Sequence, residues 1–185
     1  MDDFAAALEA FLAQRRDELK TKYDRVLPTG ELLFNRFDKA RYLSMGKNSS
    51  VYDTSVVMGD ITVGDNVWIG PYTLLEGIHG KVTIGNFVSI NTGVIICTHD
   101  STKHYLSGGI DPFQKGDVSI GSNTVVGSMS MICCGVNIGK HCLIGANSLV
   151  SQSVEDYTIV AGTPAKPIGR VEIRPDGSVE LLYHK

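Results

Sequence analysis

Branched aliphatic residues stand six positions apart in three runs of this 185-residue chain. Side chains alternate every two residues in a strand and every 3.6 in a helix, so neither element alone explains a period of six. A short strand followed by a turn explains this period. Three such units form the three sides of a triangular coil of about 18 residues, which pairs with the next coil. The period therefore predicts an all-β fold, a left-handed parallel β-helix of about five coils. The members of the three runs are Val51, Val57, Val63, Ile69 and Leu75, then Ile84, Ile90 and Ile96, then Ile120, Val126, Ile132, Ile138, Ile144 and Val150.

Turn-forming residues follow the aliphatic positions. Gly-Asp-Asn at 64–66, Gly-Asn at 85–86 and Gly-Ser-Asn at 121–123 combine residues that tolerate positive φ or bond their own backbone. This pattern predicts tight corners between the sides of each coil, with the aliphatic side chains pointing into the interior.

The six-residue count breaks at two places. The spacing from Leu75 to Ile84 is nine, so three extra residues bulge around 78–80. The spacing from Ile96 to Ile120 is 24, which predicts an excursion loop at 99–117. Repeat proteins usually place such insertions on one face, where binding happens, so these breaks mark the expected site.

The two ends of the chain do not follow the repeat. We expect residues 1–50 to form a helix and a cap over the first coil, because an open coil end is an exposed strand edge. Residues 51–166 form the β-helix, and residues 167–185 form a hairpin that turns at Pro175-Asp176-Gly177. The predicted helix, at 2–22, has an apolar stripe made by Phe4, Leu8, Phe11, Leu12 and Leu19.

Composition narrows the range of functions. Hydrophobic residues make up 43% of the chain and the net charge is −3, so nothing favours nucleic acid or a membrane as a partner. The start, Met-Asp-Asp, lacks the basic and apolar regions of a signal peptide. Four cysteines within the repeats are typical of reduced thiols, and we expect a cytoplasmic protein.

The repeats and the closing segment 160–167 (VAGTPAKP) resemble the hexapeptide acyltransferases, a family of trimeric, acyl-CoA-dependent enzymes. The segments 95–101 (IICTHDS), 106–109 (LSGG) and 23–30 (YDRVLPTG) are similar to the branch that acylates sugars for bacterial surface polysaccharides. The resemblance implies transfer of an acyl group, acetyl first, from CoA to the amino group of a nucleotide-linked amino sugar. It also implies a homotrimer with active sites between subunits and no metal. The alternative acceptor is a hydroxyl group of a sugar or another small molecule.

His99 is the candidate catalytic residue, because it stands where the regular coil ends and where the family has its catalytic histidine. A neutral imidazole there can take the proton of the attacking acceptor as it reaches the thioester carbonyl. Asp100 either orients His99 or forms part of the turn. With an amine acceptor the base is less necessary, and His99 then serves to position the sugar.

The resemblance also implies which residues meet the two substrates. Small residues beside the pantetheine arm and a lysine near the nucleotide phosphates give the expected CoA-binding set: Gly127, Ser128, Gly145, Ala146, Ser151, Gln152, Thr163 and Lys166. Polar residues in or beside the interrupted repeats give the expected sugar-binding set: Glu76, His79, Asn91, His104 and Tyr105.

Two other functions compete with this interpretation. The γ-class carbonic anhydrases share the β-helix and bind zinc through three histidines, two of them five apart, as His99 and His104 are. His79 could be the third, but its separation of 20 residues from His99 is no whole number of 18-residue coils. The other alternative is a non-catalytic β-helix that serves as a binding surface, which would have little use for a long polar excursion.

Overall fold

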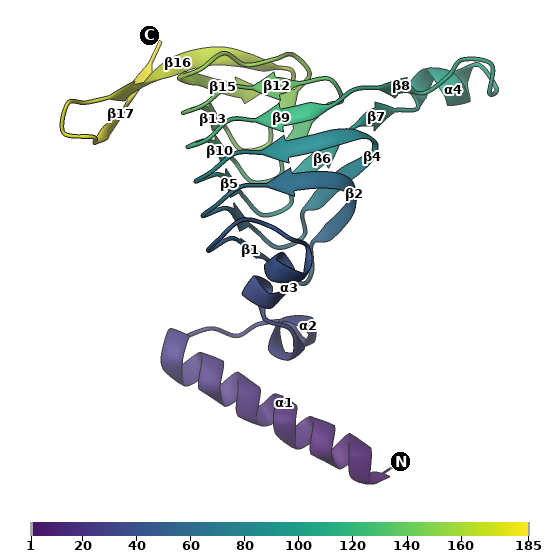
Figure 1. Cartoon of the computed structure of the whole chain (residues 1–185), viewed down its shortest axis with the longest axis vertical. Coiled ribbons are helices and arrows are strands. Elements are labelled where there is room, and N and C mark those ends of the chain that lie inside the picture. Colours follow the sequence, from purple (N-terminus) through teal and green to yellow (C-terminus); the bar gives the residue numbers. More distant parts are fainter. Residues whose placement is uncertain (1, 185) are drawn as a thin grey trace.

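The structure is a computed structural model that describes residues 2–184 as helices, a tapering prism of strands and a C-terminal hairpin (Figure 1). An arm projects from one side of the prism. The N-terminal helices are α1 (Asp2–Tyr23), α2 (Thr29–Leu33) and α3 (Arg36–Tyr42).

The prism is a parallel β-helix with three faces, and each face is a ladder of strands from successive coils. The first face contains β1 (Ser50–Val51), β3 (Trp68–Ile69), β5 (Ser89–Ile90), β10 (Val125–Val126), β13 (Leu143–Ile144) and β15 (Thr158–Gly162). The second contains the N-terminal halves of β2 (Val56–Val63) and β4 (Leu74–Ile84), with β6 (Ile95–Cys97), β11 (Met131–Ile132) and β14 (Leu149–Val150). The third contains the C-terminal halves of β2 and β4, with β9 (Val118–Ile120) and β12 (Asn137–Ile138).

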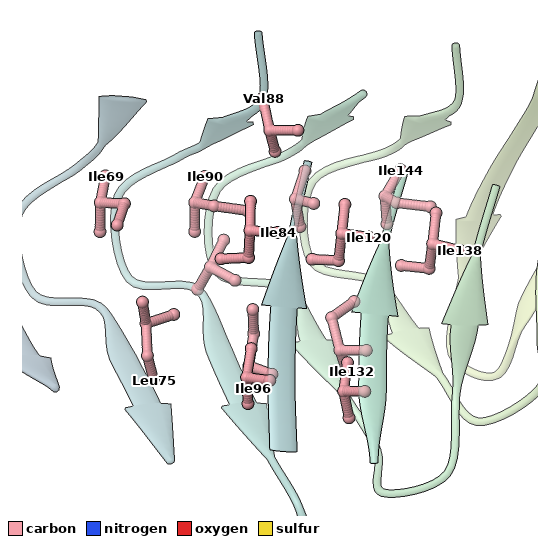
Figure 2. Close-up of a cluster of buried hydrophobic side chains, with 14 of the residues drawn as sticks. Ile69, Leu75, Ile84, Val88, Ile90, Ile96, Ile120, Ile132, Ile138 and Ile144 are labelled. Atoms are coloured by element: carbon pink, nitrogen blue, oxygen red, sulfur yellow. The ribbon is translucent and has the colours of Figure 1, made fainter. Parts of the chain in front are cut away.

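The interior of the prism is the predicted aliphatic ladder. Of the fourteen residues at six-residue spacing, thirteen are buried and Val57 is partly buried against them. Figure 2 shows the inward side chains of successive coils in rows, with Ile69, Ile90 and Ile144 in one row and Leu75, Ile96 and Ile132 in another. The stacking follows from strand register, because Ile90 pairs with Val126 and Val126 with Ile144 on neighbouring coils. The predicted inward orientation of the repeat is confirmed.

One corner of the prism shows the predicted turn chemistry. Asn66, Phe87 and Asn123 lie above one another with φ of 57°, 54° and 59°. Their N–H groups donate to carbonyl oxygens of the preceding coil, as in Phe87 N to Asp65 O at 2.9 Å. Asparagine tolerates this left-handed conformation at small cost. The corner therefore adds a second column of hydrogen bonds along the prism.

The lower end of the prism is covered by α3. Ala40 of α3 is buried in the core, and Lys39 Nζ donates to the carbonyl oxygens of Tyr52, Asp53 and Ser55 at 2.8–3.1 Å. The predicted cap within residues 1–50 thus lies in α3. The helix predicted at 2–22 is present as α1, but it lies away from the prism and leaves Phe4 73% exposed (Figure 1).

The upper end of the prism carries the hairpin. β16 (Ala165–Ile173) pairs antiparallel with β15 and with β17 (Val179–Tyr183), so the hairpin extends the first face. Its turn is the predicted one: Gly177 has φ +83° and Ser178 N donates to Asp176 Oδ1. The first hairpin strand starts at Ala165, two residues before the boundary expected at 167.

The excursion expected at 99–117 forms the arm. β7 (His99–Asp100) pairs antiparallel with β8 (Gln114–Lys115), and α4 (Thr102–Leu106) lies between them. Gly116 N donates to Thr98 O at 3.0 Å, which closes the base of the arm. The chain leaves the coil at His99 and rejoins it at Val118 without disturbing the ladder above.

Truncation of one core side chain tests the ladder. Ile132→Ala removes a fully buried side chain between two coils, and we expect a loss of about 2–5 kcal/mol in the free energy of unfolding. The measurement is urea denaturation of the variant and the wild-type protein. Ile110→Ala is the control, because Ile110 is 85% exposed on the arm and its loss should change stability by less than about 0.5 kcal/mol. Equal costs for both variants would contradict this core.

Candidate active site

Both breaks of the six-residue count lie at one corner of the prism, between its second and third faces. The residues 78–80 turn this corner in β4, and the arm leaves from the same corner one coil above. Here the imidazole rings of His79 and His99 lie 4.3 Å apart, centroid to centroid. The expectation that the interruptions gather at one place is confirmed.

The separation of 20 residues does not keep these histidines apart. The objection that His79 cannot lie beside His99, because 20 is no whole number of 18-residue coils, was therefore wrong. The coil between them contains the three inserted residues and is 21 residues long, since Leu75 pairs with Ile96. The same pairing aligns Glu76 with Cys97 and brings Glu76 to the base of the arm.

Glu76 is the charged group at the centre of the site. Its side chain is only 5% exposed, and Oε2 lies 3.0 Å from His99 Nδ1. Oε2 also accepts from Thr98 N at 2.8 Å and Thr98 Oγ1 at 3.1 Å, while Oε1 accepts from Ile78 N at 2.7 Å. Four donors therefore compensate the carboxylate for its lost hydration.

The balance of these contacts keeps Glu76 ionised. Burial alone raises the pKa of a carboxyl group, but the hydrogen bonds from Thr98, His99 and Ile78 outweigh it and lower the pKa of Glu76 from 4.5 to about 2. A carboxylate acceptor fixes the proton of neutral His99 on Nδ1. The lone pair is then on Nε2, which is the form a general base needs.

Phe113, in the returning part of the arm, packs against this pair. Its ring stacks on His99 at 5.7 Å with an interplanar angle of 17°, and lies 4.7 Å from the ring of His104. His104 Nδ1 in turn lies 2.8 Å from Asp111 O. The arm therefore supports the ring of His99 through Phe113. Sequence analysis missed Phe113, because a lone phenylalanine inside an excursion carries no spacing signal.

A pocket of about 460 Å³ opens beside His99. Burial raises the pKa of Cys97, Cys133 and Cys134, which leaves neutral thiols on its wall. The pocket is lined by Cys97, His99, Asp100, Ser101, Thr102, Gln114, Met131, Cys133, Cys134 and Ser151. Its wall is the edge of the second face, so His99 lies at the rim of an outward-facing groove.

The structure brings only part of the predicted sugar-binding set to this corner. Glu76 and His79 are in contact with the site, and His104 and Tyr105 lie on α4 in the arm. Asn91 lies at another corner, where its Oδ1 accepts from Ser89 Oγ at 2.8 Å. Glu76 is positioned to hold His99 rather than a substrate.

The side chain of Asp100 forms part of the turn and does not orient His99. Its Oδ1 accepts from Thr102 N at 2.7 Å, and this hydrogen bonding lowers the pKa of the exposed carboxyl. The group that holds His99 is Glu76, which comes from the preceding coil. Candidates for that role could have been found in sequence by counting the 21-residue coil.

The predicted CoA-binding residues fall into separate places. Ser151 lines the pocket of His99, whereas Gln152 and Lys166 line a second cleft at the upper end of the prism. Thr163 Oγ1 donates to Asn147 O at 3.2 Å.

The small residues at 127–128 and 145–146 stack on one corner of successive coils. A Cβ on Gly127 would lie 2.5 Å from Ala146 N, and one on Gly145 would lie 2.8 Å from Ala161 Cβ. Coil stacking alone therefore requires glycine at both positions. Ser128 and Ala146 belong to the same corner, where Asn147 N donates to Ser128 O at 2.9 Å.

Comparison with known proteins identifies the family. The model of the bacterial transferase hexapeptide (six repeats) matches residues 117–152. The dTDP-4-amino-4,6-dideoxy-D-glucose acyltransferase of Escherichia coli is 31% identical over 146 residues, which cover 71% of this chain and 76% of that protein. The chain belongs to the hexapeptide-repeat transferases. The resemblance seen in the sequence is confirmed, and with it the prediction of an acyltransferase.

Two further relatives show how the family varies. Chloramphenicol acetyltransferase of Escherichia coli is 36% identical over 106 residues, 48% of this chain and half of that protein. A crystal structure of a mutant of AntD, an N-acyltransferase from Bacillus cereus, holds dTDP and coenzyme A. It matches with a TM-score of 0.61 and 26% identity over 68% of this chain and 72% of that one. Among residues 2–184, no helix is long and apolar enough to cross a membrane.

The low pKa of Glu76 predicts acid sensitivity of the fold. A carboxyl whose pKa is lower in the folded state stabilises the fold above its ordinary pKa of 4.5, and this contribution is lost as the pH falls to about 2. The shift corresponds to a contribution on the order of 3 kcal/mol at neutral pH. We expect urea denaturation in metal-free buffer to show a smaller loss of stability between about pH 6 and about pH 3, a range that covers the upper part of that window, in Glu76→Gln than in wild type. Glu172→Gln, at an exposed position, should follow the wild-type dependence. Identical pH dependence of all three proteins would contradict the role of Glu76.

Proposed function

We propose that this protein transfers an acyl group, acetyl first, from acyl-CoA to the amino group of a nucleotide-linked amino sugar. The observation that carries the proposal is the hydrogen bond between Glu76 and His99 at the rim of the pocket. The relatives support it, because one is named as an acyltransferase of a dTDP-linked amino sugar and another is an N-acyltransferase seen with dTDP and coenzyme A.

The chemistry needs one proton acceptor. The acceptor nitrogen attacks the thioester carbonyl carbon, a C–N bond forms, and His99 Nε2 takes the proton that the nitrogen loses. The tetrahedral intermediate then breaks its C–S bond and releases CoA, whose sulfur receives the proton from His99. Glu76 stabilises the imidazolium that exists between these two steps, because its negative charge lies 3.0 Å from Nδ1. Asp100, by contrast, stabilises the turn at the base of the arm.

A hydroxyl acceptor is the second candidate, and the same hydrogen-bonded pair of Glu76 and His99 favours it. A neutral amine is already a good nucleophile, whereas a hydroxyl group needs its proton removed as it attacks. A buried carboxylate that fixes the tautomer of His99 leaves Nε2 free to remove that proton. The relative named chloramphenicol acetyltransferase supports this candidate, because chloramphenicol is not a nucleotide-linked sugar.

Acyl-CoA binding is assigned to the pocket of His99 together with the cleft at the upper end of the prism. Ser151 lines the pocket, and Gln152 and Lys166 line the cleft. Lysine is suited to phosphate as a flexible point charge. Thr163, and the glycine corner with Ser128 and Ala146, remain assigned to CoA on the family resemblance. His79, His104, Tyr105 and Asn91 remain the candidates for the sugar.

We also propose that the active unit is a homotrimer, with the second face against a neighbour. The outward side chains of that face form a continuous apolar column beside the pocket: Val56, Leu74, Ile95, Met131 and Leu149. Met131 both belongs to this column and lines the pocket of His99. A neighbour packed there would turn the open pocket into a closed groove, which a water-sensitive acyl transfer needs. We further propose that the prism winds left-handed and has about five coils. We also propose that the protein works in the reducing cytoplasm, because the described cysteines are free.

Removal of the base tests the catalytic assignment. We expect His99→Ala to lower the rate of acetyl-CoA-dependent thiol release by about 10²–10⁴-fold, because that is the usual contribution of a general base. The assay presents acetyl-CoA with a panel of nucleotide-linked amino sugars and simple sugars. His141→Ala, at a corner far from the arm, is the matched control. Full activity of His99→Ala would sink the general-base role, and turnover on hydroxyl acceptors alone would favour O-acylation.

A charge in the apolar column tests the trimer. We expect Met131→Glu to shift the sedimentation coefficient from a trimer towards a monomer and to abolish thiol release, because a buried unpaired carboxylate is costly. Val26→Glu is the control for an added charge at an apolar position that is 80% exposed. A wild-type monomer, or an unchanged trimer in Met131→Glu, would contradict this interface.

A further inference from the structure

Two histidines face one carboxylate at the corner of the prism. His99 Nδ1 lies 3.0 Å from Glu76 Oε2, and His79 Nδ1 lies 3.5 Å from Glu76 Oε1. The ligand atoms of the three residues all lie within 4.8 Å of one another. The proton transfers of the proposed reaction need only His99 and Glu76 here, so His79, a candidate for contact with the sugar, takes no part in them.

His79 Nδ1 is also an unsatisfied atom. It is buried and has no hydrogen-bond partner among residues 2–184, since the contact to Glu76 is too long for a good bond. A buried polar atom without a partner costs about 1–3 kcal/mol. The neighbouring backbone holds it there, because His79 N donates to Thr98 Oγ1 at 3.2 Å.

We propose that Glu76, His79 and His99 form a binding site for a divalent cation of the zinc class. Two imidazole nitrogens and a carboxylate are a zinc ligand set, and a fourth position open to water completes a tetrahedron. Ligand atoms around a tetrahedral zinc lie about 3.3 Å apart, which is close to the contacts of 3.0 and 3.5 Å already present. The side chains of His99 and His79 are 28% and 27% exposed, so an ion can reach both rings from solvent.

Occupation of this site excludes catalysis by His99, a consequence that rests on the proposed function. A metal ion binds the lone pair of Nδ1 and displaces its proton, so the remaining proton of the ring is on Nε2. In that form Nε2 is a donor and cannot accept a proton from the acyl acceptor. The metal is therefore an inhibitor that competes with the Nδ1 proton held by Glu76, and no cofactor of the reaction.

Zinc binding is measured without any substrate. Protein treated with a chelator and dialysed is titrated with Zn²⁺ by calorimetry, and Co²⁺ is added separately to record the d–d absorption of a nitrogen and oxygen site. We expect one ion per chain, and an affinity about tenfold or more lower in His79→Gln, since even partners of ligands contribute 10–100-fold. His104→Gln, on the arm but outside the cluster, should bind as wild type does.

The thiols beside the pocket are the competing zinc ligands. A Cys133→Ser/Cys134→Ser variant should keep the site, and the Co²⁺ spectrum should lack sulfur charge-transfer bands. Absence of stoichiometric binding, wild-type affinity in His79→Gln, or loss of binding in the cysteine variant would each overturn the proposal.

Activity provides the second readout. Where thiol release is observed, Zn²⁺ should inhibit the wild-type protein, a chelator should reverse the inhibition, and His79→Gln should be about tenfold or more less sensitive. Zinc binding without any acyl transfer would refute the proposed function and leave the metal site standing. Acyl transfer that Zn²⁺ inhibits equally in wild type and His79→Gln would refute the site and leave the function standing.

Discussion

The stacking of coils in register is the constraint on which the rest of the structure depends. Most strands of the prism are only two or three residues long, so they are not stable by themselves. Stability comes from the column of buried aliphatic side chains and from backbone hydrogen bonds to the coils above and below. A residue inserted within a strand would move every later side chain to the wrong face, so insertions are tolerated only at corners.

That tolerance explains where the site lies. The three residues at 78–80 and the arm at 99–117 both leave the prism at one corner, while Leu75, Ile96 and Ile132 continue the ladder inside. The regular coils supply a rigid frame, and the interrupted corner supplies polar groups without cost to the core. Glu76 is the clearest example of such a polar group. Its carboxylate is nearly buried and stays charged because it accepts hydrogen bonds from backbone N–H groups that the corner leaves free of the ladder.

The sequence predicted the fold well because a period of six leaves few alternatives. It located Ile69 and Ile144 in the core, the asparagine corner and the hairpin turn at Gly177. It also indicated His99 as the candidate at the start of the arm, since the break in the count is visible without a structure. It did not reveal that Glu76 holds His99 or that Phe113 supports it. The first pairing depends on a coil of 21 residues, and the second on how the arm folds back, which no repeat rule governs.

The position of the proton on the His99 ring distinguishes a general base, which carries it on Nδ1, from a ring that carries it on Nε2 and cannot accept another there. Nitrogen NMR of the imidazole observes this position directly. In metal-free protein at neutral pH, with His99 assigned by comparison with His99→Ala, we expect that Nδ1 carries the proton and that Nε2 resonates as an unprotonated nitrogen. The same spectrum of Glu76→Gln should lose this preference. A wild-type His99 whose proton is on Nε2 would contradict the claim that the interrupted corner prepares a general base.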